Sequence, residues 1–199
     1  ILAKEKINFI VYDNFSNCKN SVIKKIEKIT NKKINFVKGD MRDKKLLEDT
    51  FKKNEITSVI HLAALKSISN SISRPLDYFD VNITGTLNLL NVMNSNGVKK
   101  LLFSSSAAIY GEPKYLPIDE IHPLKALNPY GETKLIIENL FKDIVLSDEK
   151  WSIVCLRYFN PIGSHQSKLI GDDPLFEKSV NLMPAIINVV KGFKKELDI

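Results

Sequence analysis

A tyrosine and a lysine four residues apart, Tyr130 and Lys134, are the side chains of this sequence best suited to proton transfer. On a helix, positions i and i+4 lie one above the other on the same face. A tyrosine with a pKa near 10 is a poor base at neutral pH, and lowering that pKa to about 7 requires about 4 kcal/mol. One ammonium about 4 Å away supplies an energy of that order at an effective dielectric constant near 20. The pair therefore indicates general acid/base catalysis, although the same spacing also arises by chance in many helices.

Three consecutive serines, Ser104 to Ser106, end an apolar run and stand about 25 residues before this pair. In open parallel sheets, ligands bind outside the carboxyl ends of the strands. Hydroxyl groups at that place can bind a substrate oxygen and share its proton with the tyrosine. A polar turn is the plainer interpretation, because serine is common in turns. A strand, then serines, then a Tyr-x-x-x-Lys helix is more specific than either part, and it favours acid/base catalysis.

Residues that could hold a dinucleotide follow three other apolar runs. Asp13 and Asn14 follow an early run, where a carboxylate can accept hydrogen bonds from ribose hydroxyls and repel a 2′-phosphate, which favours NAD over NADP. An ordinary turn explains these two residues equally well. Asp40 and Met41 follow the next run and could hold an adenine. The segment His61–Lys66 closes a third run, and its small residues would let a cofactor approach the backbone.

Strand-like and helix-like segments alternate along the chain. Short apolar runs predict strands over residues 7–12, 34–37, 59–63, 100–105 and 152–157. Helical spacing of apolar residues predicts helices over residues 22–29, 46–51, 76–95, 130–146 and 182–191. Strands that are buried on both faces and separated by helices are typical of a doubly wound parallel α/β sheet.

The longest predicted helix, residues 76–95, should turn Phe79, Ile83, Leu87 and Leu90 toward the core. This expectation follows from the apolar spacing alone.

Two further helices carry start signals. Asp43 is the expected N-cap of the helix over residues 46–51, and Asn128 with Pro129 should open the helix that carries Tyr130. From residue 161 the pattern becomes rich in loop-forming residues. We therefore expect residues 1–160 to form the sheet domain and residues 161–199 to begin a substrate-binding portion.

Composition excludes several classes of protein. The chain has 199 residues, of which 44% are hydrophobic, so it is too apolar for a disordered protein. Of its 29 basic residues only three are arginine, the residue on which base readout depends, and we expect no nucleic-acid partner. No apolar run approaches the roughly 20 residues that span a membrane. The two cysteines fit a reducing, intracellular setting, and no cysteine or histidine spacing predicts a metal site.

The motifs together resemble the extended short-chain dehydrogenase/reductase family and, within it, the subgroup of UDP-glucose 4-epimerases. The resemblance runs along essentially the whole chain. Its motifs are Tyr-Asp-Asn-Phe at 12–15, Gly-Asp-Met-Arg at 39–42, His-Leu-Ala-Ala-Leu-Lys at 61–66, Asn-Ile-Thr-Gly-Thr at 82–86, Ser-Ser-Ser-Ala-Ala-Ile-Tyr-Gly at 104–111, Pro-Tyr-Gly-Glu-Thr-Lys at 129–134, Leu-Arg-Tyr-Phe-Asn-Pro-Ile-Gly at 156–163 and Asn-Leu-Met-Pro at 181–184.

This resemblance implies a role for individual residues. Tyr130 would be the catalytic base, Ser106 its hydroxyl partner at the sugar O4, and Lys134 would tune Tyr130 and hold the nicotinamide ribose. The other implied cofactor-binding residues are Asp13 and Asn14 at the adenosine ribose, Asp40 and Met41 at the adenine, and Ala63, Lys66, Asn82 and Tyr158 along the cofactor. The implied substrate-binding residues are Lys66, Ser106, Tyr130, Asn160, Asn181 and Leu182.

The implied protein is a cytoplasmic isomerase with a Rossmann-type NAD-binding domain over residues 1–160. It would interconvert UDP-galactose and UDP-glucose through a transient 4-keto sugar and enzyme-bound NAD. Members of the subgroup pair through two long helices, so the resemblance also implies a homodimer through residues 76–95 and 130–146. A 4-epimerase for UDP-N-acetylhexosamines or UDP-uronates, and a non-catalytic Rossmann-like binding protein, remain alternatives.

One expected motif is absent from this sequence. The glycine-rich loop that follows the first strand in the family has no counterpart, and with it the first, central strand of the sheet is missing. We expect the neighbouring strands to face a gap about twice the usual strand spacing. The chain is therefore expected to be a fragment that is inactive by itself.

Overall fold

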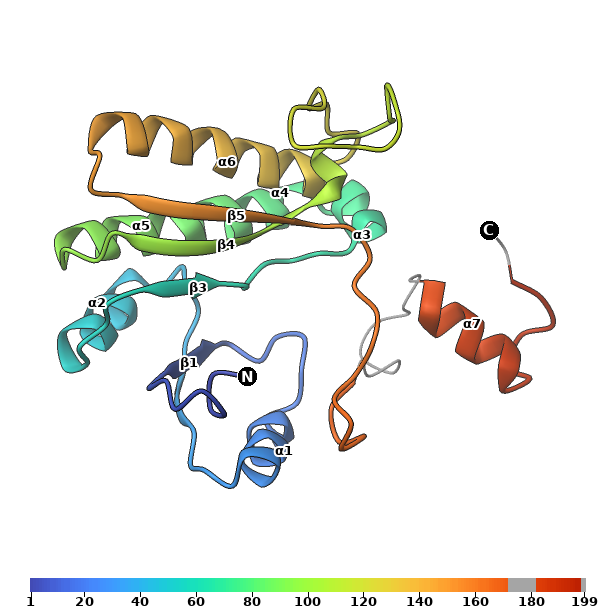
Figure 1. The fold of residues 1–199 in the computed structure, drawn as a ribbon, viewed down its shortest axis with the longest axis horizontal. Helices are drawn as coiled ribbons and strands as arrows, with labels where there is room; N and C mark the ends of the chain where they lie inside the picture. The colour runs from blue at the N-terminus through green and yellow to red at the C-terminus, as the bar shows by residue number, and fades with distance from the viewer. Residues whose placement is uncertain (172–181, 198–199) are drawn as a thin grey trace. The chain divides into compact units, whose positions relative to one another are not determined.

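Helices and strands alternate throughout the computed structural model, which describes residues 1–171 and 182–197 (Figure 1). The strands are β1 (Ile10–Asp13), β2 (Asn35–Lys38), β3 (Val59–His61), β4 (Lys100–Ser106) and β5 (Ser152–Tyr158). The helices are α1 (Ser21–Thr30), α2 (Lys44–Lys53), α3 (Ile68–Ser73), α4 (Pro75–Tyr78), the π-helix η1 (Phe79–Thr84), α5 (Gly85–Ser95), the 3₁₀ turn η2 (Ala107–Ile109), α6 (Pro129–Ser147) and α7 (Leu182–Val190). The five predicted strands and their order along the chain are confirmed.

All strand pairs are parallel, which confirms the predicted α/β class. β1 pairs with β2, and β3, β4 and β5 form a second sheet in that order. Among the described residues, β1 pairs with no strand but β2, and β3 with none but β4. The predicted gap between the strands that would flank a missing central strand stays a prediction.

The chain divides into two compact units. One comprises Gly39–Asn160, and the other comprises Ile1–Lys38 together with Pro161–Ile199. In the second unit, the Glu27 carboxylate of α1 accepts a hydrogen bond from the Ile34 amide (3.2 Å), which fastens the helix to the start of β2. The predicted domains, residues 1–160 and 161–199, stay a prediction.

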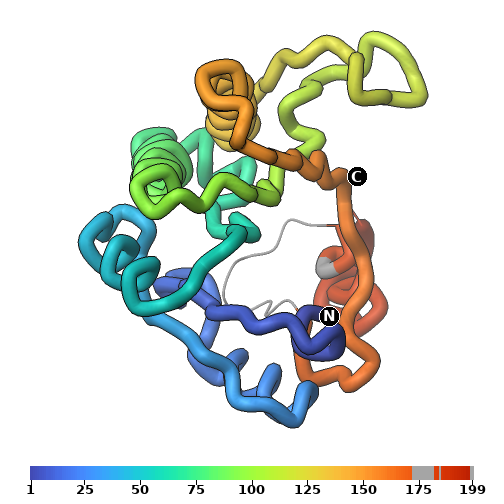
Figure 2. The backbone as a smooth tube through the Cα atoms, turned by 60° about the vertical axis from the view of Figure 1, so that its left-hand side comes forward, coloured from blue at the N-terminus to red at the C-terminus, as the bar shows by residue number. Residues whose placement is uncertain are grey.

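Within the unit Gly39–Asn160, helices α2, α5 and α6 lie along one face of the β3–β4–β5 sheet (Figures 1 and 2). Strand β4 accordingly alternates between buried and half-buried side chains. Phe103 of β4 is fully buried, and its ring meets that of Phe141 from α6 edge-on at 5.1 Å between centroids. Met93 of α5 and Ile137 of α6 complete this core. The apolar layer fixes α6, and therefore Tyr130, over the end of β4.

The predicted long helix over residues 76–95 is three pieces, α4, η1 and α5, and its predicted inward face is confirmed only in part. Leu90 is buried, but Phe79 and Leu87 are 36% and 40% exposed, whereas the polar Asn82 and Thr86 are each 1% exposed. In η1 the buried residue is Asn82 rather than the predicted Ile83. Asn82 and Thr86 tolerate burial because both side chains form hydrogen bonds inside the unit.

The two predicted N-caps are confirmed. The Asp43 carboxylate accepts a hydrogen bond from the Leu46 amide (3.0 Å), and the Asn128 side chain accepts one from the Gly131 amide (2.8 Å). Pro129 occupies the first turn of α6. Such caps typically contribute about 1 kcal/mol each to helix stability.

A loop between η2 and α6 folds back on itself around His122. The ring of this buried histidine accepts a hydrogen bond from the Lys114 amide at Nε2 (2.9 Å), and its Nδ1 lies 2.9 Å from the Pro123 carbonyl oxygen. The Lys125 amide donates a hydrogen bond to the Ile109 carbonyl (2.9 Å). The second half of the loop therefore passes directly beside η2. Gly111, with φ +66°, makes this passage possible.

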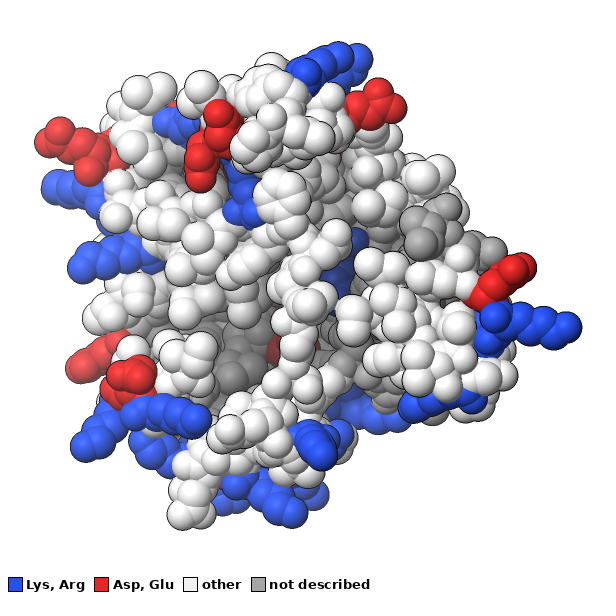
Figure 3. All heavy atoms as spheres, turned by 45° about the vertical axis from the view of Figure 1, so that its right-hand side comes forward, with Lys and Arg blue, Asp and Glu red and all other residues white. Residues whose placement is uncertain are grey.

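Charged side chains are scattered over the surface drawn in Figure 3, most of which is uncharged. Lys and Arg are interspersed there with Asp and Glu. No helix within residues 1–171 and 182–197 is long and apolar enough to cross a membrane.

Replacing Gly111 with alanine should destabilise the chain far more than the same change at Gly97. Both residues have nearly the same positive φ, +66° and +70°. A Cβ at Gly111 would lie 2.1 Å from the Lys125 carbonyl oxygen, whereas one at Gly97 would meet nothing within 4 Å. We expect Gly97→Ala to cost about 1 kcal/mol of unfolding free energy and Gly111→Ala about 3 kcal/mol. Urea denaturation measures both, and equal losses would contradict the loop packing.

Candidate active site

Three consecutive serines at the end of β4 each contact a different side chain of α6. The Lys134 ammonium donates a hydrogen bond to the Ser104 carbonyl (2.8 Å). The Ser105 hydroxyl donates to the Glu138 carboxylate (2.5 Å). The Ser106 hydroxyl accepts a hydrogen bond from the Ala108 amide (3.2 Å) and lies near Tyr130, whose pKa it tends to lower. The structure therefore brings together Ser106, Tyr130 and Lys134, the three residues predicted to carry the chemistry.

Glycine is required where α6 reaches this strand end. A Cβ on Gly131 would lie 2.7 Å from the Ala108 carbonyl oxygen of η2. Any larger residue would push the first turn of α6, and Tyr130 with it, away from Ser106. The glycine inside the Tyr-Gly-Glu-Thr-Lys motif thus has a local steric cause.

Burial dominates the protonation of both catalytic candidates. It raises the pKa of Tyr130, and the hydrogen bond with Ser106 only partly opposes this. Burial also lowers the pKa of Lys134 to about 8. The Lys134 ammonium lies 5.9 Å from the centroid of the Tyr130 ring and is directed to Ser104. Lys134 is not among the causes of the Tyr130 shift, and the predicted lowering of the Tyr130 pKa by Lys134 stays a prediction.

A buried ion pair that the sequence analysis missed lies next to these residues. Glu138 of α6 is 4% exposed and forms a salt bridge of 2.8 Å with Arg157 of β5. Arg157 also donates to the Tyr110 hydroxyl (3.0 Å) and the Glu120 carbonyl (3.2 Å). Positions 130, 134 and 138 follow one helical stripe, and this spacing was the signal that could have identified Glu138.

Asn82 lies inside the unit rather than along an open surface. Its side-chain oxygen accepts a hydrogen bond from the Leu65 amide (2.8 Å). Its side-chain nitrogen donates to the Leu65 carbonyl (3.1 Å) and to the Thr133 hydroxyl (3.0 Å). These bonds tie the segment after β3 to α6. That Asn82 lies along the cofactor stays a prediction.

Four other predicted residues are exposed at or just beyond the carboxyl ends of β3 and β5. Ala63 and Lys66 follow β3, Tyr158 ends β5, and Asn160 lies two residues farther on. The carboxyl ends of strands in one parallel sheet share one edge. These four residues and the Ser106–Tyr130 pair therefore belong to the same edge of the β3–β4–β5 sheet.

Asp40 and Met41 lie in a loop that is fastened to η1 and α5. The Asp40 carboxylate accepts hydrogen bonds from the Arg42 guanidinium (2.8 and 2.9 Å), and Arg42 forms a second ion pair with Asp80 (2.7 Å). Met41 is buried, and its carbonyl accepts a hydrogen bond from the Asn88 side chain (3.2 Å). The loop is thus held in one conformation by polar contacts on both sides of Met41.

The remaining predicted residues belong to the other unit. Asp13 ends β1, and its carboxylate accepts a hydrogen bond from the Phe15 amide (2.6 Å). The Asn14 side chain accepts one from the Ser16 amide (2.9 Å), so both residues form the turn that follows the strand. Leu182 is the exposed first residue of α7. Asn181 lies outside the described residues.

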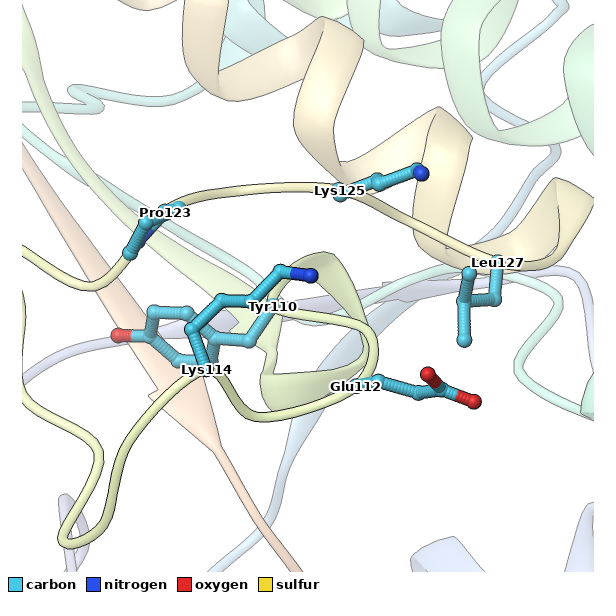
Figure 4. Close-up of a pocket in the computed structure, with 6 residues that line it drawn as sticks. All are labelled: Tyr110, Glu112, Lys114, Pro123, Lys125 and Leu127. Atoms are coloured by element: carbon cyan, nitrogen blue, oxygen red, sulfur yellow. The ribbon is translucent and has the colours of Figure 1, made fainter.

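Figure 4 shows a pocket of about 60 Å³ in the loop between η2 and α6. None of the predicted site residues lines it. The Tyr110 hydroxyl points away from the side of Glu112 and Leu127, in keeping with its bond to Arg157. The pocket is lined by Tyr110, Glu112, Lys114, Pro123, Lys125 and Leu127.

His61, the last residue of β3, is buried. Its Nε2 lies 2.9 Å from the Thr86 hydroxyl, and burial, with a smaller effect of Lys134, lowers its pKa to about 3. The ring is therefore neutral at physiological pH. Within residues 1–171 and 182–197, no group of three or more His, Cys, Asp or Glu side chains is arranged to hold a metal ion.

Comparison with known proteins agrees with this geometry. The family model described as "NAD dependent epimerase/dehydratase family" matches residues 1–188. The chain is 46% identical over 192 residues to the UDP-glucose 4-epimerase of Dictyostelium discoideum, covering 96% of this chain and 55% of that protein. It is 43% identical over 198 residues to the UDP-glucose 4-epimerase of Bacillus subtilis, covering 100% of this chain and 58% of that protein.

A solved structure is similar over nearly the whole chain. It is the UDP-glucose 4-epimerase of Bifidobacterium longum in complex with NAD⁺ and UDP, with a TM-score of 0.92 and 43% identity over 98% of this chain and 58% of that one. The similarity confirms the Rossmann-like fold. The chain spans a little more than half the length of the relatives it matches. Its sequence and its fold place the chain in the NAD dependent epimerase/dehydratase family.

Proposed function

We propose that the protein containing this chain is a UDP-glucose 4-epimerase, an isomerase that interconverts UDP-galactose and UDP-glucose. The observation that carries the proposal is the contact of α6 with the carboxyl end of β4, where the Lys134 ammonium donates a hydrogen bond to the Ser104 carbonyl (2.8 Å) and Tyr130 lies near enough to Ser106 for the serine to affect its pKa. The UDP-glucose 4-epimerases that this chain resembles at 43% and 46% identity support the choice of substrate.

Tyr130 and Ser106 would exchange the proton of the sugar 4-hydroxyl. The Ser106 hydroxyl would form hydrogen bonds with both the Tyr130 phenol and the sugar O4. Tyr130 would take the proton of the 4-hydroxyl as C4 is oxidised. Because burial raises the pKa of Tyr130, its protonated form is also a competent acid for returning the proton to the 4-keto sugar. NAD⁺, when bound, would supply hydride transfer at C4 of the sugar and a positive charge beside the phenol, and Lys134 would hold its nicotinamide ribose.

The exposed residues at the sheet edge fit an extended dinucleotide. Ala63 leaves room for close approach, and Lys66 and Tyr158 offer a cation and a ring that are open to solvent. Asp13 would accept the hydroxyls of the adenosine ribose, beside Asn14. Asp40 and Met41 would lie at the adenine and Asn82 along the cofactor, and the hydrogen bonds of the Asp40 and Asn82 side chains would hold these residues in place.

Lys134 would hold the nicotinamide ribose through its ammonium, which already donates to a neighbouring carbonyl. Asn160, Asn181 and Leu182 would contact the UDP-sugar, with Lys66. These roles are part of the proposal. We also propose that the protein acts in the cytoplasm, in keeping with the free thiols of Cys18 and Cys155.

A chimera tests the function. In it, these 199 residues replace the matching segment of the Bacillus subtilis relative, which supplies the glycine-rich loop. We expect the chimera to bind NAD and convert UDP-galactose into UDP-glucose, and Tyr130→Phe to lower kcat by at least about 100-fold. The chain by itself, whose sequence contains no glycine-rich loop, should show no turnover.

Each other outcome of the chimera experiment has a defined meaning. Turnover of UDP-N-acetylhexosamines or UDP-uronates without UDP-galactose would assign a different 4-epimerase. Nucleotide binding by a folded chimera without turnover would favour a non-catalytic binding protein. Full activity of the Tyr130→Phe chimera would overturn the proposed site.

We further propose that the complete protein is a homodimer through α4–α5 and α6. Leu76, Leu87, Val145 and Leu146 are exposed apolar residues on these helices. Light scattering of the chimera should give twice the mass of one chain, and a shift to monomer is expected when Leu87 and Leu146 are both replaced by glutamate. A native chimera that is monomeric at micromolar concentration would contradict this.

The buried ammonium of Lys134 predicts a specific pH dependence of stability. Its pKa is about 8 in the folded chain, below the value of an unfolded lysine, about 10.4. The unfolded chain therefore binds more protons between these values, so the unfolding free energy rises with pH in that window. Relative to Lys134→Met, the native chain should gain about 2 kcal/mol between pH ~7 and pH ~9.5. Urea denaturation at both pH values measures the gain, and an unchanged difference would refute it.

A further inference from the structure

Three residues that lie one turn apart on α6 each contact a different one of the three serines at the end of β4. Tyr130 meets Ser106, Lys134 meets Ser104, and Glu138 meets Ser105. Tyr130 and Lys134 have chemical roles in the proposed function. Glu138 has none, although it is the most polar member of the stripe and is buried.

The Glu138 carboxylate is saturated by two neighbours from two strands. One oxygen accepts the Ser105 hydroxyl at 2.5 Å, and the other accepts Arg157 Nη2 at 2.8 Å. Ser105 and Arg157 are opposite each other in the register of β4 and β5. The carboxylate therefore joins one helix and two strands at a single point, one residue before Ser106.

Arg157 extends the connection beyond the sheet. Its second guanidinium nitrogen donates to the Tyr110 hydroxyl, directly after η2, and to the Glu120 carbonyl of the following loop. Ser106 lies between these anchored points: Ser105 precedes it in β4, and η2 with Tyr110 follows it. Both sides of Ser106 are thus fixed to the same ion pair.

We propose that Glu138 is a positioning residue that, through Ser105 and Arg157, holds the Ser106 hydroxyl against Tyr130. The inference rests on the proposed function of Tyr130 and Ser106. A buried ion pair is weak evidence for a role in stability, because replacing both partners with apolar residues of similar size is often neutral or stabilising. Such a replacement does not restore the hydrogen bond from the Ser105 hydroxyl to residue 138.

The test observes Tyr130 in the 199-residue chain, without any turnover. The chain is labelled with ¹³C at tyrosine Cζ, the Tyr130 resonance is assigned with Tyr130→Phe, and its pKa is measured by NMR titration. Ser106→Ala removes the Ser106 hydroxyl itself, so its shift is the reference for complete loss of the contact. We expect it to raise the Tyr130 pKa by about 0.5 to 1 pH unit. Asp143→Asn, which removes an exposed carboxylate from the same helix, is the matched control and should leave the pKa unchanged.

Two variants address Glu138 itself. Glu138→Gln keeps the shape but weakens the bonds, and Glu138→Met with Arg157→Met removes the ion pair without a net change in charge. Both should raise the Tyr130 pKa by at least half of the Ser106→Ala shift. The direction is diagnostic, because loss of a nearby negative charge alone would lower a tyrosine pKa.

Three results would overturn the inference. The first is a Tyr130 pKa that stays at its wild-type value in both folded Glu138 variants although Ser106→Ala shifts it. The second is no shift in Ser106→Ala, since the contact to be held would then not exist. The third is loss of the folded state in both variants, because Glu138 would then support the whole unit rather than the site. An inactive chimera would refute the proposed epimerase without changing any of these readings.

Discussion

Helix α6 approaches the end of strand β4 closely enough that only glycine fits at position 131, where a Cβ would stand 2.7 Å from the Ala108 carbonyl oxygen. That approach lets the serine run and the polar stripe of the helix exchange hydrogen bonds. It depends in turn on the apolar layer beneath, where Phe103 and Phe141 pack edge-on. Packing thus sets the distance, and the polar contacts then set the orientation of Tyr130.

Low polarity around this contact has consequences for every charged group within it. Lys134, His61 and Tyr130 all shift toward their neutral forms, because water is excluded from their surroundings. Such groups are sensitive to any new charge placed next to them, which suits a site whose protonation must change during a reaction. The structure therefore links the burial that stabilises the fold to the chemistry proposed at its edge.

Much of this architecture could be predicted from the sequence. The strands, the caps Asp43 and Asn128, and the association of Ser106 with Tyr130 follow from local patterns that the tertiary structure does not override. The inward face of residues 76–95 could be predicted only in part, because apolar spacing assumes a regular helix and takes polar residues to be exposed. Asn82 and Thr86 are buried since hydrogen bonds to Leu65 and Thr133, and to a turn of their own helix, replace those with water.

The raised pKa of Tyr130 could not be predicted for a related reason. Spacing places Lys134 on the same stripe but says nothing of the Ser104 carbonyl that captures its ammonium, or of the desolvation of the phenol. Glu138 was missed because a charged residue on a helix is usually solvated, and only the strand register that pairs Ser105 with Arg157 explains its burial. Long-range partners, rather than local propensity, decide these positions.

The central claim is that Tyr130 and Ser106 form one catalytic centre at the carboxyl end of β4. A crystal structure of the chimera with NAD⁺ and a UDP-sugar tests it most directly. We expect the Tyr130 Oη and Ser106 Oγ atoms both to lie within hydrogen-bond distance, about 2.5 to 3.2 Å, of the sugar O4. A sugar whose C4 faces other side chains, with Tyr130 turned away from Ser106, would contradict it.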